Sequence, residues 1–597
     1  MTLLSLPIKR IHYTSILFIS IPLVLSAFTH LWNPVGFPGI HWDEGTYIRR
    51  AMQVLEGLGP QEVNAPRFDH PYFGQLFLAG AFRLLGYPNS IDTSTGDIHS
   101  IESLYMVPRV LMGLLAVLDT FLIYKISQYR YNRNVALIAS ILFAVMPLSW
   151  LTRRIYLDSI QLPFLLSSIM FAVYPYHKRS NDDPIKGDKE NDNEFSKSNN
   201  RVKTFTFLGK KNILVTVLSG VFLGIAIFTK IPAFTMIPMV GLLVYMNNRV
   251  PNVSSIDPDN KNKKFEKSKA SVIPSVRSVW GAIKNRSLLS VGIWFIPVIL
   301  IPATWPAYSI MTNHFDDWKE GVIWQATQRP HLGIFDSISS NFFIDPILIT
   351  LGFAGFIFAA IRRDIPLLLW IVPFLIFFTF IEGFVKWFHW IPIIPGLCIA
   401  VAKLVAYISE RLSRYIKVQQ IVIGAAVGFC IYGLVSTGIL VNTNFTSSEL
   451  NAAAFAANQL IQYKKAHPDY KSNHDITIIS GNGVSWIFKY LFGQDNTPAS
   501  FRSGKPPLKT QHVILMIDEQ FSKYLSQSAA NQTKTFKKLQ GVYSHSHKIA
   551  GFDDADKKEE TKKNVKSQQR NFNIKVFPYN KLIPSSAGTN ITITTNY

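Results

Sequence analysis

The sequence predicts an α-helical protein that crosses a membrane about eleven times and carries a small α/β domain at its C-terminal end. Of its 597 residues, 48% are hydrophobic and only 16% are charged, which is a low charged fraction for a soluble protein. Several apolar runs approach the roughly 20 residues that a helix needs to cross a bilayer. From residue 442 the composition becomes that of a soluble domain. We therefore expect a membrane domain over 1–441 and a soluble domain over 442–597.

The predicted spans cover residues 12–31, 105–127, 134–151, 159–177, 213–229, 231–247, 288–310, 346–361, 366–382, 388–407 and 419–441. The pair at 213–247 is interrupted by Lys230 and Pro232. The apolar run at 73–86 is too short to span, so we expect it to lie in or re-enter the interface.

The distribution of Lys and Arg predicts the orientation. With a cytoplasmic N-terminus, the cytoplasmic segments hold about 27 basic residues and the exterior loops about ten. The large loop 32–104 and the C-terminal domain are then exterior, and the polar insertions 178–212 and 248–287 are cytoplasmic and flexible. The formal charge of +22 reflects this topology, so we expect no nucleic-acid partner.

The C-terminal domain alternates helix-like and strand-like segments, which is typical of a small α/β domain. The helix-like segments are 449–466 and 484–492, and the strand-like ones are 475–480 and 512–518, with a possible further strand at 573–577. We expect the charged segment 553–570 to be mobile.

Two adjacent carboxylates, Asp43 and Glu44, follow the first span. Apolar residues at positions 47, 48, 51, 54, 55 and 58 predict an amphipathic helix that begins just after them. Carboxylates at a helix N-terminus are stabilised by the dipole and by free N–H groups, so a plain helix cap is one interpretation. A catalytic pair at the membrane surface is the other.

Further polar residues gather on the same predicted face. They are His70 before the short apolar run, Arg109 near the exterior end of the second span, Arg153, Arg154 and Asp158 in an exterior turn, and Lys386 and His389 before the tenth span. Snorkelling into lipid headgroups is the alternative for the two turn arginines, and Asp158 could pair with one of them. An aromatic interface belt is the alternative around Lys386. For Asp119, deeper in the second span, we expect a structural hydrogen-bonding role.

Taken in order, these motifs resemble those of the GT-C membrane glycosyltransferases. The resemblance covers roughly residues 10–410 and includes Asp43-Glu44, His70-Pro71, Arg109, Asp158, the run 224–230 and the segment His389-Trp390-Ile391-Pro392. Within this group the chain is most similar to the dolichyl-phosphate-mannose-protein mannosyltransferase (family 39) and aminoarabinose-transferase-like enzymes. It departs from them in having Tyr72 where the second motif commonly has a second proline. It also lacks the tandem-tryptophan signature of oligosaccharyltransferases.

The resemblance implies transfer of a sugar from a polyprenyl- or dolichyl-phosphate donor to an acceptor hydroxyl on a protein, lipid or glycan, with inversion. It assigns the general base to Asp43, with Glu44 and Asp158 as supporting carboxylates that bind sugar, orient the acceptor or hold a divalent ion. His70, Arg109, Arg153, Arg154, Lys386 and His389 become candidates for binding the donor phosphate.

Two other classes stay open. A transporter or flippase for a lipid-linked or polar solute would place ionisable groups along a path near the bilayer midplane, as only Asp119 suggests. A scaffold whose soluble domain binds partners would need far fewer spans. The sugar, the acceptor and the role of the C-terminal domain are not predicted.

Overall fold

The computed structural model describes residues 13–61, 68–86, 98–181, 210–248, 276–327, 333–382, 384–472, 474–494, 496–498, 501, 510, 512–526, 534–553 and 590–595. Most of the predicted insertions 178–212 and 248–287 lies outside these residues, as do nearly all of the predicted mobile segment 553–570 and the whole of the possible strand 573–577.

The elements of the membrane part are α1 (Tyr13–Leu31), α2 (Trp42–Leu55), α3 (Phe73–Leu84), α4 (Ile98–Arg130), α5 (Arg133–Val145), η1 (Pro147–Arg153), α6 (Leu157–Asn181), α7 (Lys210–Thr229), η2 (Ile231–Met236), α8 (Ile237–Asn247), α9 (Val276–Met311), α10 (Phe315–Thr327), α11 (Ile334–Ile344), α12 (Pro346–Ile361), α13 (Ile365–Phe377), η3 (Phe378–Glu382), η4 (Trp387–Ile393), α14 (Ile394–Arg411), η5 (Leu412–Arg414) and α15 (Val418–Val441). The C-terminal region, residues 442–597, contains α16 (Ser447–Ala466), β1 (Ile476–Ile479), α17 (Asn482–Phe492), β2 (His512–Ile517), α18 (Glu519–Leu525), α19 (Lys534–Ser544), β3 (His547–Asp553) and β4 (Asn590–Thr595).

All eleven predicted spans coincide with helical segments. Among the described residues, six helices are long and apolar enough to cross a membrane, and the bent pair formed by α5 and η1 is a seventh candidate. Four of the five shorter apolar helices supply the remaining segments. The fifth, α3, has 12 residues, as expected for the run predicted to be too short to span. The predicted class, a helical membrane protein with a small C-terminal α/β region, is confirmed.

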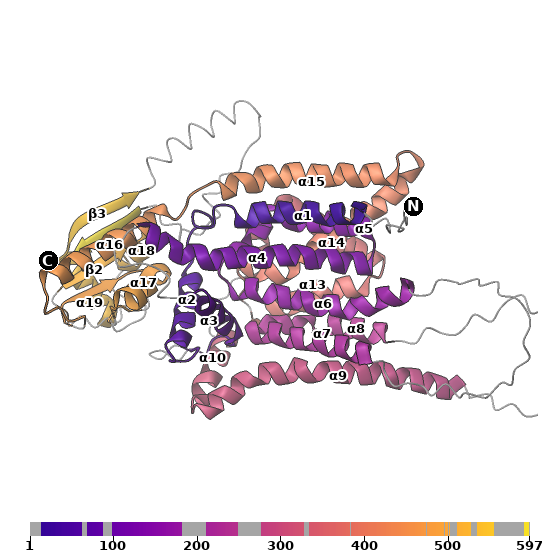
Figure 1. Cartoon of the computed structure of the whole chain (residues 1–597), viewed down its shortest axis with the longest axis horizontal. Helices are drawn as coiled ribbons and strands as arrows, with labels where there is room; N and C mark the ends of the chain where they lie inside the picture. The colour runs from indigo at the N-terminus through magenta and orange to yellow at the C-terminus, as the bar shows by residue number, and fades with distance from the viewer. Residues whose placement is uncertain are drawn as a thin grey trace, which may run out of the picture.

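The helices form a bundle whose centre and edges differ in burial. In the most apolar windows of α6 and of the span from η4 to α14, 72% of the residues are buried inside the protein, against 22% for α9 and α15. Figure 1 shows α9 and α15 at opposite edges of the bundle. Their many exposed Leu, Ile and Val side chains are therefore suited to contact with lipid.

Helix α7 packs closely against α9 through two glycines one turn apart. A Cβ on Gly220 would lie 2.3 Å from the carbonyl oxygen of Trp294, and one on Gly224 would lie 2.5 Å from that of Pro297. Small residues at this spacing let the backbones of membrane helices approach each other. The run 224–230 thus has a packing role at its start, and its last residue, Lys230, lies where α7 ends.

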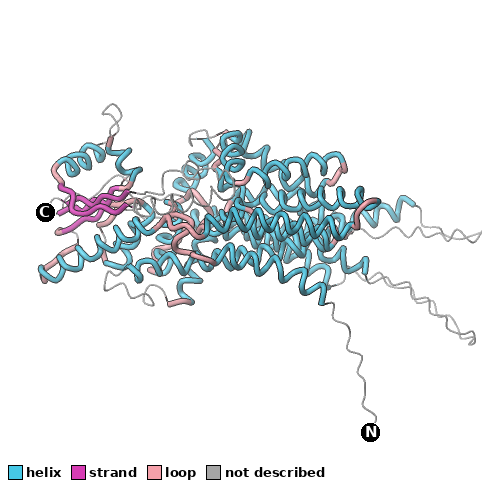
Figure 2. The backbone as a smooth tube through the Cα atoms, turned by 90° about the horizontal axis from the view of Figure 1, so that it is seen from above, coloured by secondary structure: helices cyan, strands magenta, loops and turns pink. Residues whose placement is uncertain are grey.

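The C-terminal region holds a four-stranded sheet in the order β1-β2-β4-β3. Strands β1 and β2 are parallel, with Ile476 opposite His512, whereas β4 runs antiparallel to both β2 and β3. The predicted strands at 475–480 and 512–518 and the predicted helices at 449–466 and 484–492 are confirmed. Figure 2 shows the strands grouped at one end of the elongated molecule. The sheet is thus mixed rather than purely parallel.

Helix α16 places Glu449 against the glycines that begin α17. A Cβ on Gly483 would lie 2.9 Å from the Glu449 Oε1 atom. Burial, together with the nearby carboxylate of Asp518, raises the pKa of Glu449 to about 8, although Arg109 opposes the shift. Glu449 is therefore mainly uncharged at neutral pH in the folded protein.

We expect Glu449→Gln to stabilise the protein increasingly as the pH rises from about 4.5 to about 8. In the unfolded chain this carboxyl group ionises near its usual pKa of 4.5, whereas in the folded protein it keeps its proton to about pH 8, so the wild type loses stability between those values. The variant has no such loss. Its unfolding temperature should exceed that of the wild type at pH 9 by on the order of 2 °C. The two temperatures should converge at pH 4, and a difference that does not depend on pH would contradict the assignment.

Candidate active site

The Asp43-Glu44 pair begins helix α2, as the sequence predicted. His41 is the residue before the helix, and its Nδ1 atom accepts a hydrogen bond from the Asp43 amide at 3.3 Å. In return, the His41 amide donates to the Glu44 Oε2 atom at 2.8 Å. This reciprocal pair is a capping box, with histidine in the position that serine or threonine usually takes.

Glu44 is fully buried and has four partners. Arg109 donates to both of its oxygens, from Nη2 at 3.0 Å and from Nε at 3.2 Å, and Arg154 donates from Nη1 at 3.3 Å. The amide of Ile155 adds a bond at 3.2 Å. Burial would raise the pKa of Glu44, but the two arginines outweigh it and hold that pKa below its ordinary value. Glu44 is thus a buried anion that ties α2 to α4 and to the turn before α6.

The three arginines predicted to bind phosphate are 1–2% exposed and have partners inside the protein. Arg109 donates to the Pro34 and Val35 carbonyls, Arg153 to those of Thr29, Trp32 and Asn33, and Arg154 to that of Gly39. Together they hold the connection between α1 and α2. The guanidinium groups of Arg153 and Arg154 are thus bound to backbone carbonyls of this connection, and neither arginine lines the cavity described below.

Asp43 differs from Glu44 in being accessible, because its side chain is 39% exposed. Its Oδ2 atom lies 3.7 Å from the His41 Nδ1 atom. Burial works to raise the pKa of Asp43, but His41, Lys386, Lys230 and His70 together lower it. Asp43 is therefore ionised at neutral pH, as a group that takes a proton must be.

His41 is a site residue that the sequence analysis missed. Burial, aided by the charges of Arg154 and Lys386, lowers its pKa to about 4 against the opposing effect of Asp43, so the ring is neutral at pH 7. The ring packs edge-on against Tyr156, with the centroids 5.4 Å apart. The only signal in the sequence was its place two residues before Asp43, where a cap is expected.

Asp158 does not pair with either arginine of its turn. It forms an ion pair with Lys230, whose Nζ atom lies 2.6 Å from Oδ2, and both side chains are about 95% buried. Lys230 stands in the break between α7 and η2, in extended conformation. The sequence showed Lys230 as an interruption of an apolar pair of segments, a signal that can identify a functional lysine.

A cavity of about 210 Å³ lies beside these groups. It is lined by basic and acidic side chains and by apolar ones, namely Asp69, His70, Lys230, Ile231, Pro232, Trp305, Val322, Gln325, Phe377, Ile381 and His389. Two of the residues that lower the pKa of Asp43, Lys230 and His70, belong to this lining. The cavity thus combines positive charge next to Asp43 with apolar walls from α9, α10 and α13.

Lys386 immediately precedes η4, and His389, in its first turn, lines this cavity. His389 is 4% exposed and stacks on Phe378, with ring centroids 5.2 Å apart. The Nζ atom of Lys386 lies 5.3 Å from the ring centre of Phe384. Within the described residues no carboxylate lies within ion-pair distance of Lys386, so this cation is available for a bound anion.

His70 and its neighbour Asp69 lie shortly before α3. Asp69 pairs with the buried guanidinium of Arg50 at 2.9 Å, so α2 is anchored to this segment as well. The ring of His70 lies 6.4 Å from that of Tyr47. The structure therefore brings together Asp43, His70, Lys230, Lys386 and His389. It separates them from the arginine-bound Glu44.

Metal ligation was open in the sequence. In the part of the chain that the structure describes, no three His, Cys, Asp or Glu side chains are arranged to hold a metal ion. Glu44 and Asp158 were the other carboxylates considered as metal ligands. Glu44 is bound to arginines, and Asp158 is bound to a lysine.

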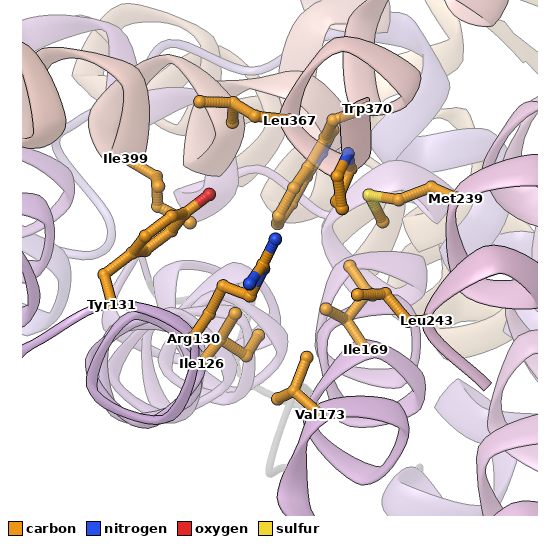
Figure 3. Close-up of a pocket in the computed structure, with 11 residues that line it drawn as sticks. Ile126, Arg130, Tyr131, Ile169, Val173, Met239, Leu243, Leu367, Trp370 and Ile399 are labelled. Carbon is orange, nitrogen blue, oxygen red and sulfur yellow. The ribbon is translucent and has the colours of Figure 1, made fainter. Parts of the chain in front are cut away.

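A second cavity lies at the opposite end of α4 and holds only about 20 Å³. Figure 3 shows the guanidinium of Arg130 pointing into it among Ile169, Met239 and Trp370. A space of this size accommodates about one water molecule and no sugar. The larger cavity is therefore the better candidate for a substrate site.

Comparisons with known proteins found similar solved structures but no similar sequence. No protein-family model matches the chain, and no curated protein matches its sequence. Similar solved structures include the oligosaccharyltransferase AglB from Archaeoglobus fulgidus, in complex with an inhibitory peptide and a dolichol-phosphate. Its sequence is 13% identical and the TM-score is 0.48, and the match covers 86% of this chain and 70% of AglB. ArnT from Cupriavidus metallidurans, bound to undecaprenyl phosphate, is 12% identical with a TM-score of 0.48, covering 88% of this chain and 96% of ArnT. Both are GT-C glycosyltransferases. Similarity at this level concerns the arrangement of the helices and assigns no substrate to this chain.

Proposed function

We propose that this chain is an integral-membrane glycosyltransferase that transfers a sugar, mannose or a similar hexose, from a polyprenyl- or dolichyl-phosphate donor to an acceptor hydroxyl on the exterior face. One observation carries the proposal. Of the three predicted catalytic carboxylates, only Asp43 is accessible, and its pKa is lowered by Lys230 and His70, which line the cavity. Glu44 and Asp158 are committed to internal ion pairs.

The cavity suits the two chemically different parts of such a donor. Lys230, His70 and His389 line it, with Lys386 nearby, and these groups would face the phosphate. Trp305, Phe377 and Ile381 provide the apolar wall that the prenyl chain requires. Because Ile381 is 59% exposed, the prenyl chain could continue from this wall into the surrounding lipid.

In the proposed step, Asp43 takes the proton of the acceptor hydroxyl while the acceptor oxygen attacks C1 of the sugar. The new C1–O bond forms as the bond from C1 to the phosphate oxygen breaks, and the electron pair leaves with the polyprenyl phosphate. The charge that grows on this leaving group is stabilised by the fixed cations more strongly than the ground state is. Attack from the face opposite the phosphate inverts C1, through an oxocarbenium-like state.

The roles of the predicted residues divide accordingly. Asp43 is the base, and His70, Lys230, Lys386 and His389 bind the donor phosphate. Glu44, Arg109, Arg153 and Arg154 form the scaffold that holds the start of α2. Asp158 orients Lys230, because their ion pair fixes the ammonium group at the cavity wall. The step as proposed needs no divalent ion.

We expect Lys386→Gln to weaken donor use. Losing one charge-assisted contact to the phosphate should raise the KM for the donor by roughly tenfold or more. Because Lys386 also lowers the pKa of Asp43, the acid limb of the pH–rate profile should move to higher pH. The matched control is Lys417→Gln, at an exposed lysine before α15, which should leave both quantities unchanged. An unchanged donor KM in Lys386→Gln would remove Lys386 from the site.

The rival function is a transporter or flippase, for which Asp119 is the main candidate residue. Asp119 is fully buried in α4, and within the described residues neither of its oxygens has a hydrogen-bond partner, so the predicted hydrogen-bonding role is not seen. The two functions are separated by adding a mannosyl-phosphoryl polyprenol to reconstituted vesicles. A transferase releases polyprenyl phosphate when serine- and threonine-containing peptides, glycolipid or oligosaccharide acceptors are supplied. A flippase moves the intact donor across the bilayer.

A further inference from the structure

The first turn of α2 contacts the C-terminal region on both sides of Asp43. Trp42 precedes Asp43 and Gly45 follows it by two residues, and each touches a segment more than 400 positions further along the chain. Glu44 holds the same turn from within the membrane part, through Arg109 and Arg154. Asp43 lies in the same turn, and two residues that line the cavity, Lys230 and His70, lower its pKa.

The contact at Gly45 is between backbones. A Cβ on Gly45 would lie 2.1 Å from the Asn482 carbonyl oxygen and 2.9 Å from the Gly483 Cα atom. Conversely, a Cβ on Gly483 would lie 2.8 Å from the Cγ2 atom of Ile40, just before α2. Both helices need glycine at this contact, because even a methyl group at Gly45 or Gly483 would push α17 away from α2.

Buried hydrogen bonds keep the start of α17 in place. The Gly483 carbonyl accepts a bond from Trp486 Nε1 at 2.9 Å and another from the Tyr105 hydroxyl. Tyr105 and Trp486 are fully buried, and Tyr105 lies one turn from Arg109 in α4. The α17 contact therefore rests on the same helix that holds Glu44.

Trp42 provides a second contact, with the core of the C-terminal region. Its ring lies edge-on to Phe501, with centroids 5.8 Å apart. Phe501 stacks in turn on Phe521 of α18, at 4.4 Å. The cluster that Trp42 joins contains Ile479, Phe501, Val513, Leu515, Ile517, Phe521, Leu525 and Leu539. A residue adjacent to Asp43 is thus packed on the sheet.

We propose that the C-terminal region positions the base, and that Gly45 and Trp42 are the positioning residues through which it sets the place of Asp43 relative to the cavity. The inference rests on the proposed role of Asp43. Misplacement of a reacting group by about 1 Å can cost about 100-fold in rate, so a tightly fixed first turn has a direct catalytic use. The C-terminal region takes no direct part in the proposed chemical step, and its role in this proposal is to position Asp43.

The test compares Gly45→Ala with Gly428→Ala. Gly428 lies on the lipid-facing helix α15, where an added Cβ meets nothing within 4 Å. With mannosyl-phosphoryl polyprenol as donor, Gly45→Ala should lower kcat by about tenfold or more while the donor KM stays unchanged. The acid limb of its pH–rate profile should move to higher pH, because Asp43 moves away from the cations that lower its pKa. Hydrogen–deuterium exchange of the peptide 40–50 should be faster than in the control.

A second pair of variants covers the case in which Gly45→Ala does not fold. Trp42→Ala should show the same loss of kcat and the same faster exchange, and Trp42→Phe should restore most of both. The inference is overturned if these variants match Gly428→Ala in kcat, acid limb and exchange, or if activity falls only in proportion to folded protein. If the wild type transfers no sugar at all, the proposed function fails, whereas the exchange comparison still decides whether the C-terminal region fixes this turn.

Discussion

Replacing Asp43 by Asn is expected to lower sugar transfer by about 10²- to 10⁴-fold, the range that a general base contributes. Asparagine keeps the size and hydrogen-bonding shape of the side chain but cannot take the proton of the acceptor hydroxyl. The fold should not change, since the Asp43 side chain is 39% exposed and its Oδ2 atom lies 3.7 Å from Nδ1 of the neutral His41 ring. The measurement is the initial rate of polyprenyl phosphate release by purified protein.

The matched control is Asp317→Asn in α10. Its side chain is 38% exposed and also faces a histidine, His314, but it does not line the cavity. This variant should retain the wild-type rate and elution profile. A rate within a few-fold of the wild type in Asp43→Asn would mean that another group takes the proton.

Replacing Glu44 by Gln is expected to have the largest effect on stability. The change leaves the guanidinium groups of Arg109 and Arg154 buried with no compensating charge. Breaking a buried ion pair by removing one partner typically costs about 3–5 kcal/mol. Thermal unfolding in detergent, followed by size-exclusion chromatography, should show a much lower midpoint and extensive aggregation.

Two further variants test the cause of that loss. Glu44→Gln combined with Arg109→Gln should recover part of the stability, because it removes one of the two uncompensated cations. Glu410→Gln, at an exposed position in the last turn of α14, should unfold as the wild type does. If Glu44→Gln also unfolds at the wild-type temperature, the buried network does not hold the site together.

Local features of the fold were predictable from the sequence because they depend on neighbouring residues. Apolar length marked all eleven spans, and the spacing from Tyr47 onward marked α2, whose observed start is Trp42. The strands at 475–480 and 512–518 are short runs rich in Ile, Val, Leu and Thr, with turn residues around them. Strands β3 and β4 were not predicted. They pair with each other, and β4 joins β2, across a long stretch of intervening chain.

The sequence could propose candidate site residues, but it could not predict their partners. Which of these residues pair depends on contacts between distant helices. Lys230 meets Asp158 across 72 positions, and Arg109 meets Glu44 across 65. Sequence alone could not distinguish an arginine that binds substrate from one that binds a backbone carbonyl. The two carboxylates of the opening pair are adjacent in sequence, but one is buried and one is accessible.

The most direct test is a comparison of wild type and Asp43→Asn on one donor. Purified protein is incubated with a mannosyl-phosphoryl polyprenol and a set of peptide, glycolipid and oligosaccharide acceptors, and both released polyprenyl phosphate and the anomeric configuration of the product are measured. The proposal predicts release and an inverted product with the wild type, and a loss of at least about 100-fold with Asp43→Asn. Equal release by both proteins, or movement of the intact donor across vesicles without release, would contradict it.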